Sequence, residues 1–206
     1  YNTMQTFIGV VGMQPLHMIS PASEDERRVE EFPAELVDYL ANLIDKNITP
    51  RDIVTRESLR NAIIVAMAVG GSTNAIIHLT AIAGRLGIPV PLKQLNTLSD
   101  ETPVLIDLKP TGDHYMEDLF KAGGLGVVLR ELKPLLNLEC LSVTGETLKE
   151  RLRSEPAYVN REVVRSFDQP IQKMGGLVSL FGSLAPGGAI LKRSAADPTL
   201  FESEGK

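Results

Sequence analysis

The run Gly70-Gly71-Ser72-Thr73-Asn74 is the first segment whose residue types could bind a ligand. Two glycines let the backbone turn tightly with positive φ and let another group approach closely. The three residues that follow are N-cap types, and the helix they would begin, residues 74–86, has N–H groups and a positive dipole end that suit a carboxylate. The competing interpretation is a close-packed helix–helix corner that is capped by its own hydroxyls, and the residues alone favour it.

A second cluster, residues 113–118 (DHYMED), brings acids and a histidine together, as a metal or acid–base site would. Adjacent residues on a helix point in different directions, so these side chains are not expected to converge on one ion. Glu117 and Asp118 would also complement the dipole of a helix that starts here. We therefore expect a helix start. The glycines at 123, 124 and 126 do not directly follow a strand, which argues against a dinucleotide site.

The histidines and the cysteine give little support for a catalytic site. His17, His78 and His114 lie far apart and none has a ligand-like spacing. Cys140 is the only cysteine, so an internal disulfide or a thiolate cluster made by this chain alone is excluded. It lies in a mainly apolar run, which favours a small buried hydrophobe. No Gly-x-Ser-x-Gly turn supports a serine nucleophile.

Composition narrows the class of protein. The 206 residues are 43% hydrophobic and 5% aromatic, with no Trp and a formal charge of -5. An acidic chain without clustered Lys and Arg is not expected to bind nucleic acid or an anionic membrane, and no apolar run is long enough to span a bilayer. One cysteine is compatible with a reducing compartment, so we expect a cytoplasmic protein. With no initiator Met and no signal pattern, both ends are expected to be cut.

Helices should position the candidate turn. Residues 1–22 read as a helix and a loop, and apolar residues recur at helical spacing over 24–46, with a kink or a new start at Pro33. Residues 47–50 are a stop signal, and Thr55 is a good N-cap for the next helix. That helix, 56–69, is hydrophobic all round from Ala62 and should be buried. Gly70 and Gly71 end it, and an amphipathic helix over 74–86 follows.

The rest of the chain mixes strand and helix signals. We expect a buried strand at 103–108 with a turn at 109–112, a glycine-interrupted helix over 114–133, a strand at 141–144 and a helix at 146–153. A boundary falls near 155–170, and beyond it 177–181 and 189–192 should form a hairpin. The prediction is an α/β fold: residues 1–165 are the later part of an α/β domain, and 166–206 are the first strands of a β-barrel-like domain.

Seven strings, taken in order, resemble the dihydroxy-acid/phosphogluconate dehydratase family over essentially the whole chain. Any one of them would be weak evidence, but their shared order is specific. They are Tyr1-Asn2-Thr3-Met4 ahead of Gly12-Met13, NITPRDI at 47–53, GGSTNAIIHL at 70–79, PVLIDLKPTG at 103–112, YMEDLFKAGG at 115–124, LSVTGETL at 141–148 and GGLVSLFGSLAPGGAILK at 175–192.

The resemblance implies a homodimeric hydro-lyase that dehydrates a small-molecule hydroxy acid, a 2,3-dihydroxy acid, to a 2-keto acid in branched-chain amino-acid biosynthesis. The family uses an iron–sulfur cluster and Mg²⁺ as Lewis acids and a serine alkoxide as base. Its cluster cysteines and metal-binding Asp and Lys should precede Tyr1, and its second-domain Glu and catalytic Ser should follow Lys206. This chain would then hold no catalytic or metal residue and would be inactive alone.

The resemblance also raises the weight of Ser72, Thr73 and Asn74 as substrate-binding residues. Two alternatives stay open. The parent could be an aldonic (sugar) acid dehydratase, or a non-catalytic relative that lacks the cluster ligands.

Overall fold

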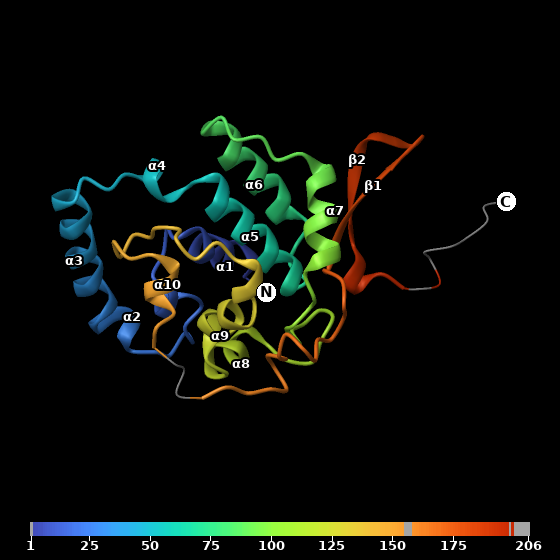
Figure 1. Cartoon of the computed structure of the whole chain (residues 1–206). Coiled ribbons are helices and arrows are strands. Elements are labelled where there is room, and N and C mark those ends of the chain that lie inside the picture. Colours follow the sequence, from blue (N-terminus) through green and yellow to red (C-terminus); the bar gives the residue numbers. More distant parts are fainter. Residues whose placement is uncertain (1, 155–157, 198, 200–206) are drawn as a thin grey trace.

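A computed structural model describes residues 2–154, 158–197 and 199. Helices surround α5 at the centre, and a two-stranded antiparallel sheet stands at one end, as Figure 1 shows. No described helix is long and apolar enough to cross a membrane. The elements are α1 (Thr3–Val11), η1 (Leu16–Met18), α2 (Arg27–Glu30), α3 (Phe32–Asp45), α4 (Pro50–Ile53), α5 (Arg56–Ala68), α6 (Asn74–Arg85), α7 (Leu92–Glu101), α8 (Met116–Lys121), α9 (Gly124–Glu131), η2 (Lys133–Leu135), α10 (Leu148–Arg151), β1 (Leu177–Gly182), β2 (Ala185–Lys192) and η3 (Arg193–Ala195).

Helix α5 is the centre of the core, as its all-apolar sequence predicted. It begins at a reciprocal cap: the Thr55 hydroxyl accepts from the N–H of Ser58, and the Ser58 hydroxyl accepts from the N–H of Thr55. From Asn61 to its end every residue is buried. The helix packs mainly against α1, and the two helices together give the candidate turn a rigid base.

The segment before α5 contains the break that was predicted at Pro33. A short helix, α2, ends at Glu30, and α3 starts afresh with Pro33 in its first turn, where a missing N–H costs nothing. Phe32 is buried, but the apolar side chains of Leu36, Val37, Leu40 and Ile44 are exposed. We call these four side chains the outer face of α3.

The strands predicted at 103–108 and 141–144 do not form as such. Val104, Leu105, Ile106 and Leu108 are buried, but this segment makes only isolated bridges, among them Val104 with Gln172 and Ile106 with Val164. Leu141 likewise makes one bridge, with Thr147. The partners of 104–106 come from the segment after residue 160, so the chain on either side of the predicted boundary is interleaved. A barrel-like second domain remains a prediction.

Helix α7 was not predicted, and it holds the sheet in place. Its Asn96 side chain accepts from the N–H of Ser179 at 2.7 Å and donates to the carbonyl of Ser179 at 2.8 Å. One turn later, the Ser99 hydroxyl donates to the carbonyl of Leu177 at 2.6 Å. These side chains take the place of a neighbouring strand along β1, which would otherwise present unpaired backbone groups.

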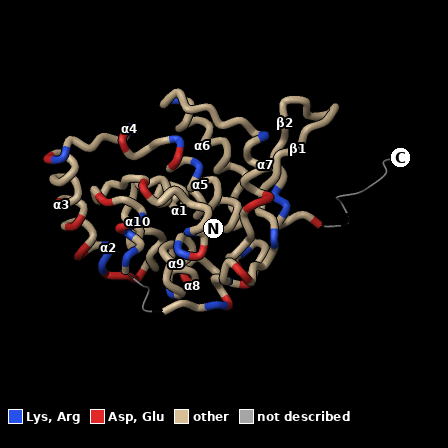
Figure 2. The backbone as a smooth tube through the Cα atoms, in the orientation of Figure 1, with Lys and Arg blue, Asp and Glu red and all other residues tan. Residues whose placement is uncertain are grey.

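The predicted hairpin is confirmed. Strands β1 and β2 pair in antiparallel register, with Leu177 opposite Lys192, Ser179 opposite Ile190, and an irregularity between Leu180 and Gly182. In Figure 2 the outer part of the hairpin carries no charge, whereas acidic and basic residues are intermixed over the helical body. The observed architecture is therefore a helix-rich, mixed α/β arrangement with one small antiparallel sheet.

Candidate functional site

The Gly70–Asn74 turn follows the end of α5 in a defined hydrogen-bond pattern. The N–H of Gly71 donates to the carbonyl of Ala66 at 2.9 Å, and the N–H of Gly70 donates to that of Met67 at 3.3 Å. This pair of bonds is the Schellman motif, which requires a left-handed residue after the helix cap. Gly70 has φ of +58°, as predicted for one of the two glycines. The chain reverses here, so a continuous helix through 66–80 is excluded.

Helix α6 starts with partial help from the predicted caps. The Ser72 hydroxyl accepts from the N–H of Asn74 at 3.2 Å, whereas Thr73, at the N-cap position, makes no capping bond. The carbonyls of Ser72 and Thr73 accept from the next two N–H groups, those of Ala75 and Ile76. The first turn of α6 is thus largely satisfied by its own chain, and it offers fewer donors to a ligand than the sequence suggested.

One backbone donor of the turn remains available. The N–H of Ser72 donates to the hydroxyl of Thr3 at 3.2 Å, which joins the turn to the first residue of α1. Over the described parts of the chain, no acceptor lies opposite the N–H of Thr73, and no partner is seen for the Thr73 hydroxyl or the Asn74 amide. Asn74 is exposed and Thr73 is half-buried. Each of these three groups is therefore free to bind a ligand.

Close backbone packing explains why glycines flank this site. A Cβ on Gly176 would lie 2.6 Å from the Cα of Gly70, and a Cβ on Gly71 would lie 3.0 Å from Cγ2 of Thr3. The N–H of Gly176 also donates to the carbonyl of Met67 at 3.0 Å. The beginning of the hairpin segment therefore rests directly on the turn. Sequence reasoning found the turn but missed Thr3 and Gly176, whose contacts are separated by about 70 and 100 residues from it.

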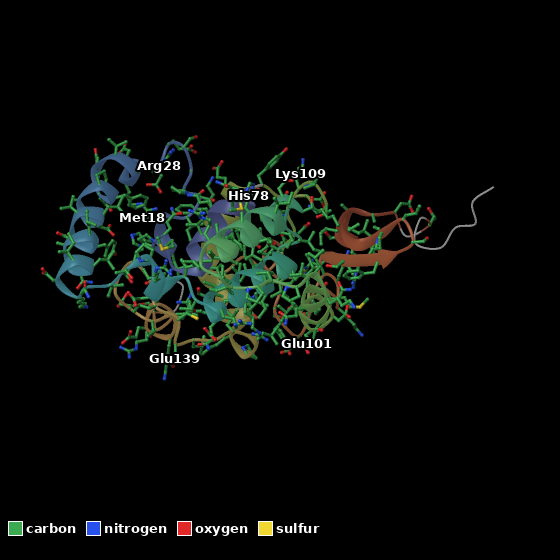
Figure 3. The ribbon with its side chains drawn as sticks, turned by 90° about the horizontal axis from the view of Figure 1, so that it is seen from above. Met18, Arg28, His78, Glu101, Lys109 and Glu139 are labelled. Atoms are coloured by element: carbon green, nitrogen blue, oxygen red, sulfur yellow. The ribbon has the colours of Figure 1, made fainter. Side chains whose placement is uncertain are left out.

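The acidic cluster predicted at 113–118 does not converge on one point. Asp107 contacts the ring Nδ1 of His114 at 3.2 Å and accepts from the N–H of Asp113 at 3.0 Å. Asp118 accepts from the N–H of Tyr115, and Glu117 pairs with Lys121 one turn along α8. Asp107 and Asp118 thus hold a turn and a helix start, and Glu117 is paired along the helix. In Figure 3, Lys109 of this region lies across the molecule from Glu101 on α7.

Cys140 is the small buried hydrophobe that the sequence predicted. Burial, with the carboxylates of Glu57 and Glu139 nearby, raises the pKa of its thiol to about 11. Its sulfur lies 3.5 Å from the side-chain amide of Asn61 on α5. A thiolate, the form that binds metals and attacks electrophiles, is strongly disfavoured in this position.

The described residues do not fit the cofactors that the resemblance implies. Across 2–154 and 158–197, no three His, Cys, Asp or Glu side chains are grouped as ligands for a metal ion. The one thiol is buried and protonated, so it does not fit as a ligand of an iron–sulfur cluster. Of the other histidines, His17 pairs with Glu35 at 2.8 Å and His78 is exposed on α6.

Family models match nearly all of the chain. The model described as dihydroxy-acid/6-phosphogluconate dehydratase N-terminal covers residues 1–151, and the corresponding C-terminal model covers residues 162–206. The chain belongs to this family. Two of the strings that carry the resemblance, at the start of α1 and at the Gly70–Asn74 turn, are the ones joined by the bond from Ser72 to Thr3.

Relatives with dehydratase names match over almost the whole chain. Dihydroxy-acid dehydratase 2 of Corynebacterium efficiens is 42% identical over 205 residues, which are 98% of this chain and 36% of the relative. The dihydroxy-acid dehydratases of Caldanaerobacter subterraneus subsp. tengcongensis and Carboxydothermus hydrogenoformans are 41% and 42% identical, each over 99% of this chain and 37% of the relative. The chain spans about a third of the length of these family members.

Proposed function

We propose that this chain is part of a hydro-lyase that removes water from a branched 2,3-dihydroxy acid and gives a 2-keto acid, in branched-chain amino-acid biosynthesis. The single observation that carries the proposal is the 41–42% identity to proteins named dihydroxy-acid dehydratase over 98–99% of this chain. An aldonic acid is the alternative substrate, because the family description also names 6-phosphogluconate dehydratase.

The Gly70–Asn74 turn is the part of this chain that we assign to substrate binding. The Thr73 N–H and the Asn74 amide are donors, and a carboxylate accepts such bonds strongly because it is ionised. The turn contacts the first residue of α1, and the resemblance puts a cluster cysteine shortly before that helix. A substrate carboxylate held by Thr73 and Asn74 would then extend its hydroxyl-bearing carbons towards the reacting centre.

In that pose, this chain orients the substrate and does not transfer its protons. Dehydration removes the hydroxyl from C3 and a proton from C2, and the resulting enol becomes the 2-keto acid. An iron–sulfur cluster and Mg²⁺, which the resemblance implies, would supply Lewis acidity to the whole protein. We place their ligands, and the serine base, outside this sequence. A homodimer, a cytoplasmic location and a β-barrel-like domain from residue 166 onward belong to the same proposal.

The full-length protein containing this chain provides the test. Formation of a 2-keto acid should be measured from a branched 2,3-dihydroxy acid and from an aldonic acid, on a sample of known iron content. We expect the branched acid to be the better substrate. No keto acid from either compound, with the cluster present, would contradict the proposal and would favour the non-catalytic alternative. The 206-residue chain alone should form none.

Asn74→Asp tests the turn itself. A carboxylate at this position would repel the substrate carboxylate, so we expect KM to rise about tenfold or more, the loss of one charge-assisted bond. Asn47→Asp makes the same chemical change in a different, exposed turn and is the matched control. Equal KM values for the two variants would contradict the assignment of Asn74 to substrate binding.

A further inference from the structure

A hollow of about 400 Å³ lies between α5, the segment 88–90 and α7. Its residues on α5 come from the first two turns of that helix, whereas the Gly70–Asn74 turn follows the last one. Glu101, at the end of α7, marks this side of the molecule in Figure 3. The hollow is therefore separate from the proposed substrate site, and none of the interactions described so far involves it.

The floor of the hollow is aliphatic. Leu59 and Ile63 of α5 and Leu95 and Leu98 of α7 are buried beneath it, and Ile88, Pro89 and Val90 form a wall. Among the described residues no aromatic ring lines it, so they offer a flat ring no stacking partner. The volume is at the small end of the range for ligand pockets. These features fit a short or branched aliphatic chain.

Two cations stand on one edge of this floor. Arg56 and Arg60 are one helical turn apart and so share a face of α5. The Nη1 atom of Arg60 donates to the carbonyl of Leu135 at 2.8 Å, which fixes its direction. In the part of the chain that the structure describes, neither arginine lies within 4 Å of a carboxylate, so the fork of Arg56 and the remaining N–H groups of Arg60 are available. A guanidinium at the rim of an apolar pocket is well suited to a carboxylate.

We propose that this hollow binds a small aliphatic monocarboxylate, with its carboxylate on Arg56 and Arg60 and its carbon chain on the floor. Glu101 lines the same hollow from α7 and, over the described ranges, also lacks a cationic partner. It can receive an ammonium group. A simple aliphatic acid and an aliphatic amino acid therefore share the binding chemistry, and the side chain of Glu101 distinguishes them.

Methyl NMR of the full-length protein, labelled at isoleucine δ1, provides the test. The probes are 3-methylbutanoate, leucine and, as a neutral control, 3-methylbutanol. We expect the methyl signals of Ile63 and Ile88 to shift with the carboxylates at millimolar concentration and to stay in place with the alcohol. No shift with either acid, as when another part of the protein fills the hollow, would overturn the proposal. An equal response to the alcohol would also overturn it.

Amino-acid substitutions test which side chain binds the ligand carboxylate. Arg56→Gln should weaken binding of both acids about tenfold or more, because Arg56 is exposed and its guanidinium makes no hydrogen bond or ion pair with the described residues. Arg85→Gln, an exposed arginine on α6, is the matched control and should change nothing. Unchanged binding in Arg56→Gln would contradict the assignment. Glu101→Gln should weaken binding of leucine and leave binding of 3-methylbutanoate unchanged if Glu101 receives the ammonium group, and should weaken neither if the hollow recognises the carboxylate and the carbon chain alone.

The proposal that the hollow binds a carboxylate and the proposed dehydratase activity can be tested independently. Keto-acid formation by Arg56→Gln should equal that of the unmodified protein, because Arg56 lies at the far end of α5 from the substrate turn. Binding of 3-methylbutanoate is read from Ile63 whether or not the sample is active.

Discussion

Helices α5 and α3 have nearly the same length, 13 and 14 residues, and both carry apolar side chains at helical spacing. In α5, Ile64, Val65 and Met67 are 0–1% exposed. On the outer face of α3, Leu36, Val37, Leu40 and Ile44 are 49–70% exposed. Periodicity predicts which side chains share a face, but whether this chain covers that face depends on its neighbours. In Figure 1, α3 stands at the opposite end of the molecule from the hairpin.

Truncation in α5 should have the largest effect on stability. Met67 has no exposed surface, so Met67→Ala would leave a cavity that the packed helices cannot close, and the free energy of unfolding should fall by about 2–5 kcal/mol. Urea unfolding of the purified chain measures this change. Val37→Ala on α3 is the control and should shift the value by less than about 0.5 kcal/mol. Similar losses in both variants would mean that the outer face of α3 is buried in solution.

Cys140 reports on the packing beside α5 through its pH dependence. With a pKa of about 11 in the fold against 9.0 unperturbed, its thiolate fraction at pH 8 should be about 100-fold lower than that of a free thiol. Iodoacetamide should therefore alkylate the native chain at least that much more slowly than the unfolded chain. Because the folded pKa is raised, the stabilising contribution of the neutral thiol is complete below pH 9 and is lost between pH 9 and 11. Equal alkylation rates would show that Cys140 is accessible.

The hairpin should be held less firmly than α5. Asn96→Ala removes both side-chain bonds to the backbone of Ser179 and should cost about 1–3 kcal/mol. In amide exchange, the region beyond residue 165 should exchange faster than residues 56–86, and this variant should accelerate Ser179 further while leaving α5 unchanged. Equally slow exchange in both regions of a monomeric sample would contradict the boundary predicted near residue 165.

The smallest effect is expected on α3. Leu40→Gln replaces an exposed apolar side chain, so the free energy of unfolding should stay within about 0.5 kcal/mol of the original. Solubility should rise, because exposed apolar patches promote association. A large destabilisation of the isolated chain would contradict the open face seen here.

Local signals in the sequence were sufficient for the elements that depend on local chemistry. Thr55 marked the start of α5, Pro33 the start of α3, and the glycines at 70 and 71 the end of α5. Helix α7 was missed because its apolar residues, Leu92, Leu95 and Leu98, form a narrow stripe among polar residues. Pro91 directly before that stripe was the signal that could have revealed it. Residues 103–108 read as a strand because they are apolar and buried, but strand pairing depends on distant partners.

In the candidate site, too, the local residues predicted some features, and others depend on tertiary packing. The tight turn and the positive φ of Gly70 followed from the residues themselves. The engagement of Ser72 by Thr3, which leaves Thr73 as the donor, depends on how α1 packs beside α5. Local sequence patterns do not show which distant residues come into contact. The sequence therefore predicted more open N–H groups than the structure has.

The interleaving of residues 104–107 with the segment after residue 160 has a consequence for how this protein can be divided. Backbone bonds run from Asp107 to the carbonyl of Val163, from Arg165 to that of Leu105, and from Ile171 to that of Val104. The gap between the two family-model matches, residues 152–161, thus divides the sequence, but the segments on its two sides are hydrogen-bonded to each other in the folded protein. A chain cleaved once within it should migrate as a single particle under native conditions and separate into two pieces only in denaturant. Two fragments that end and begin within this gap should associate into the folded protein when they are expressed together.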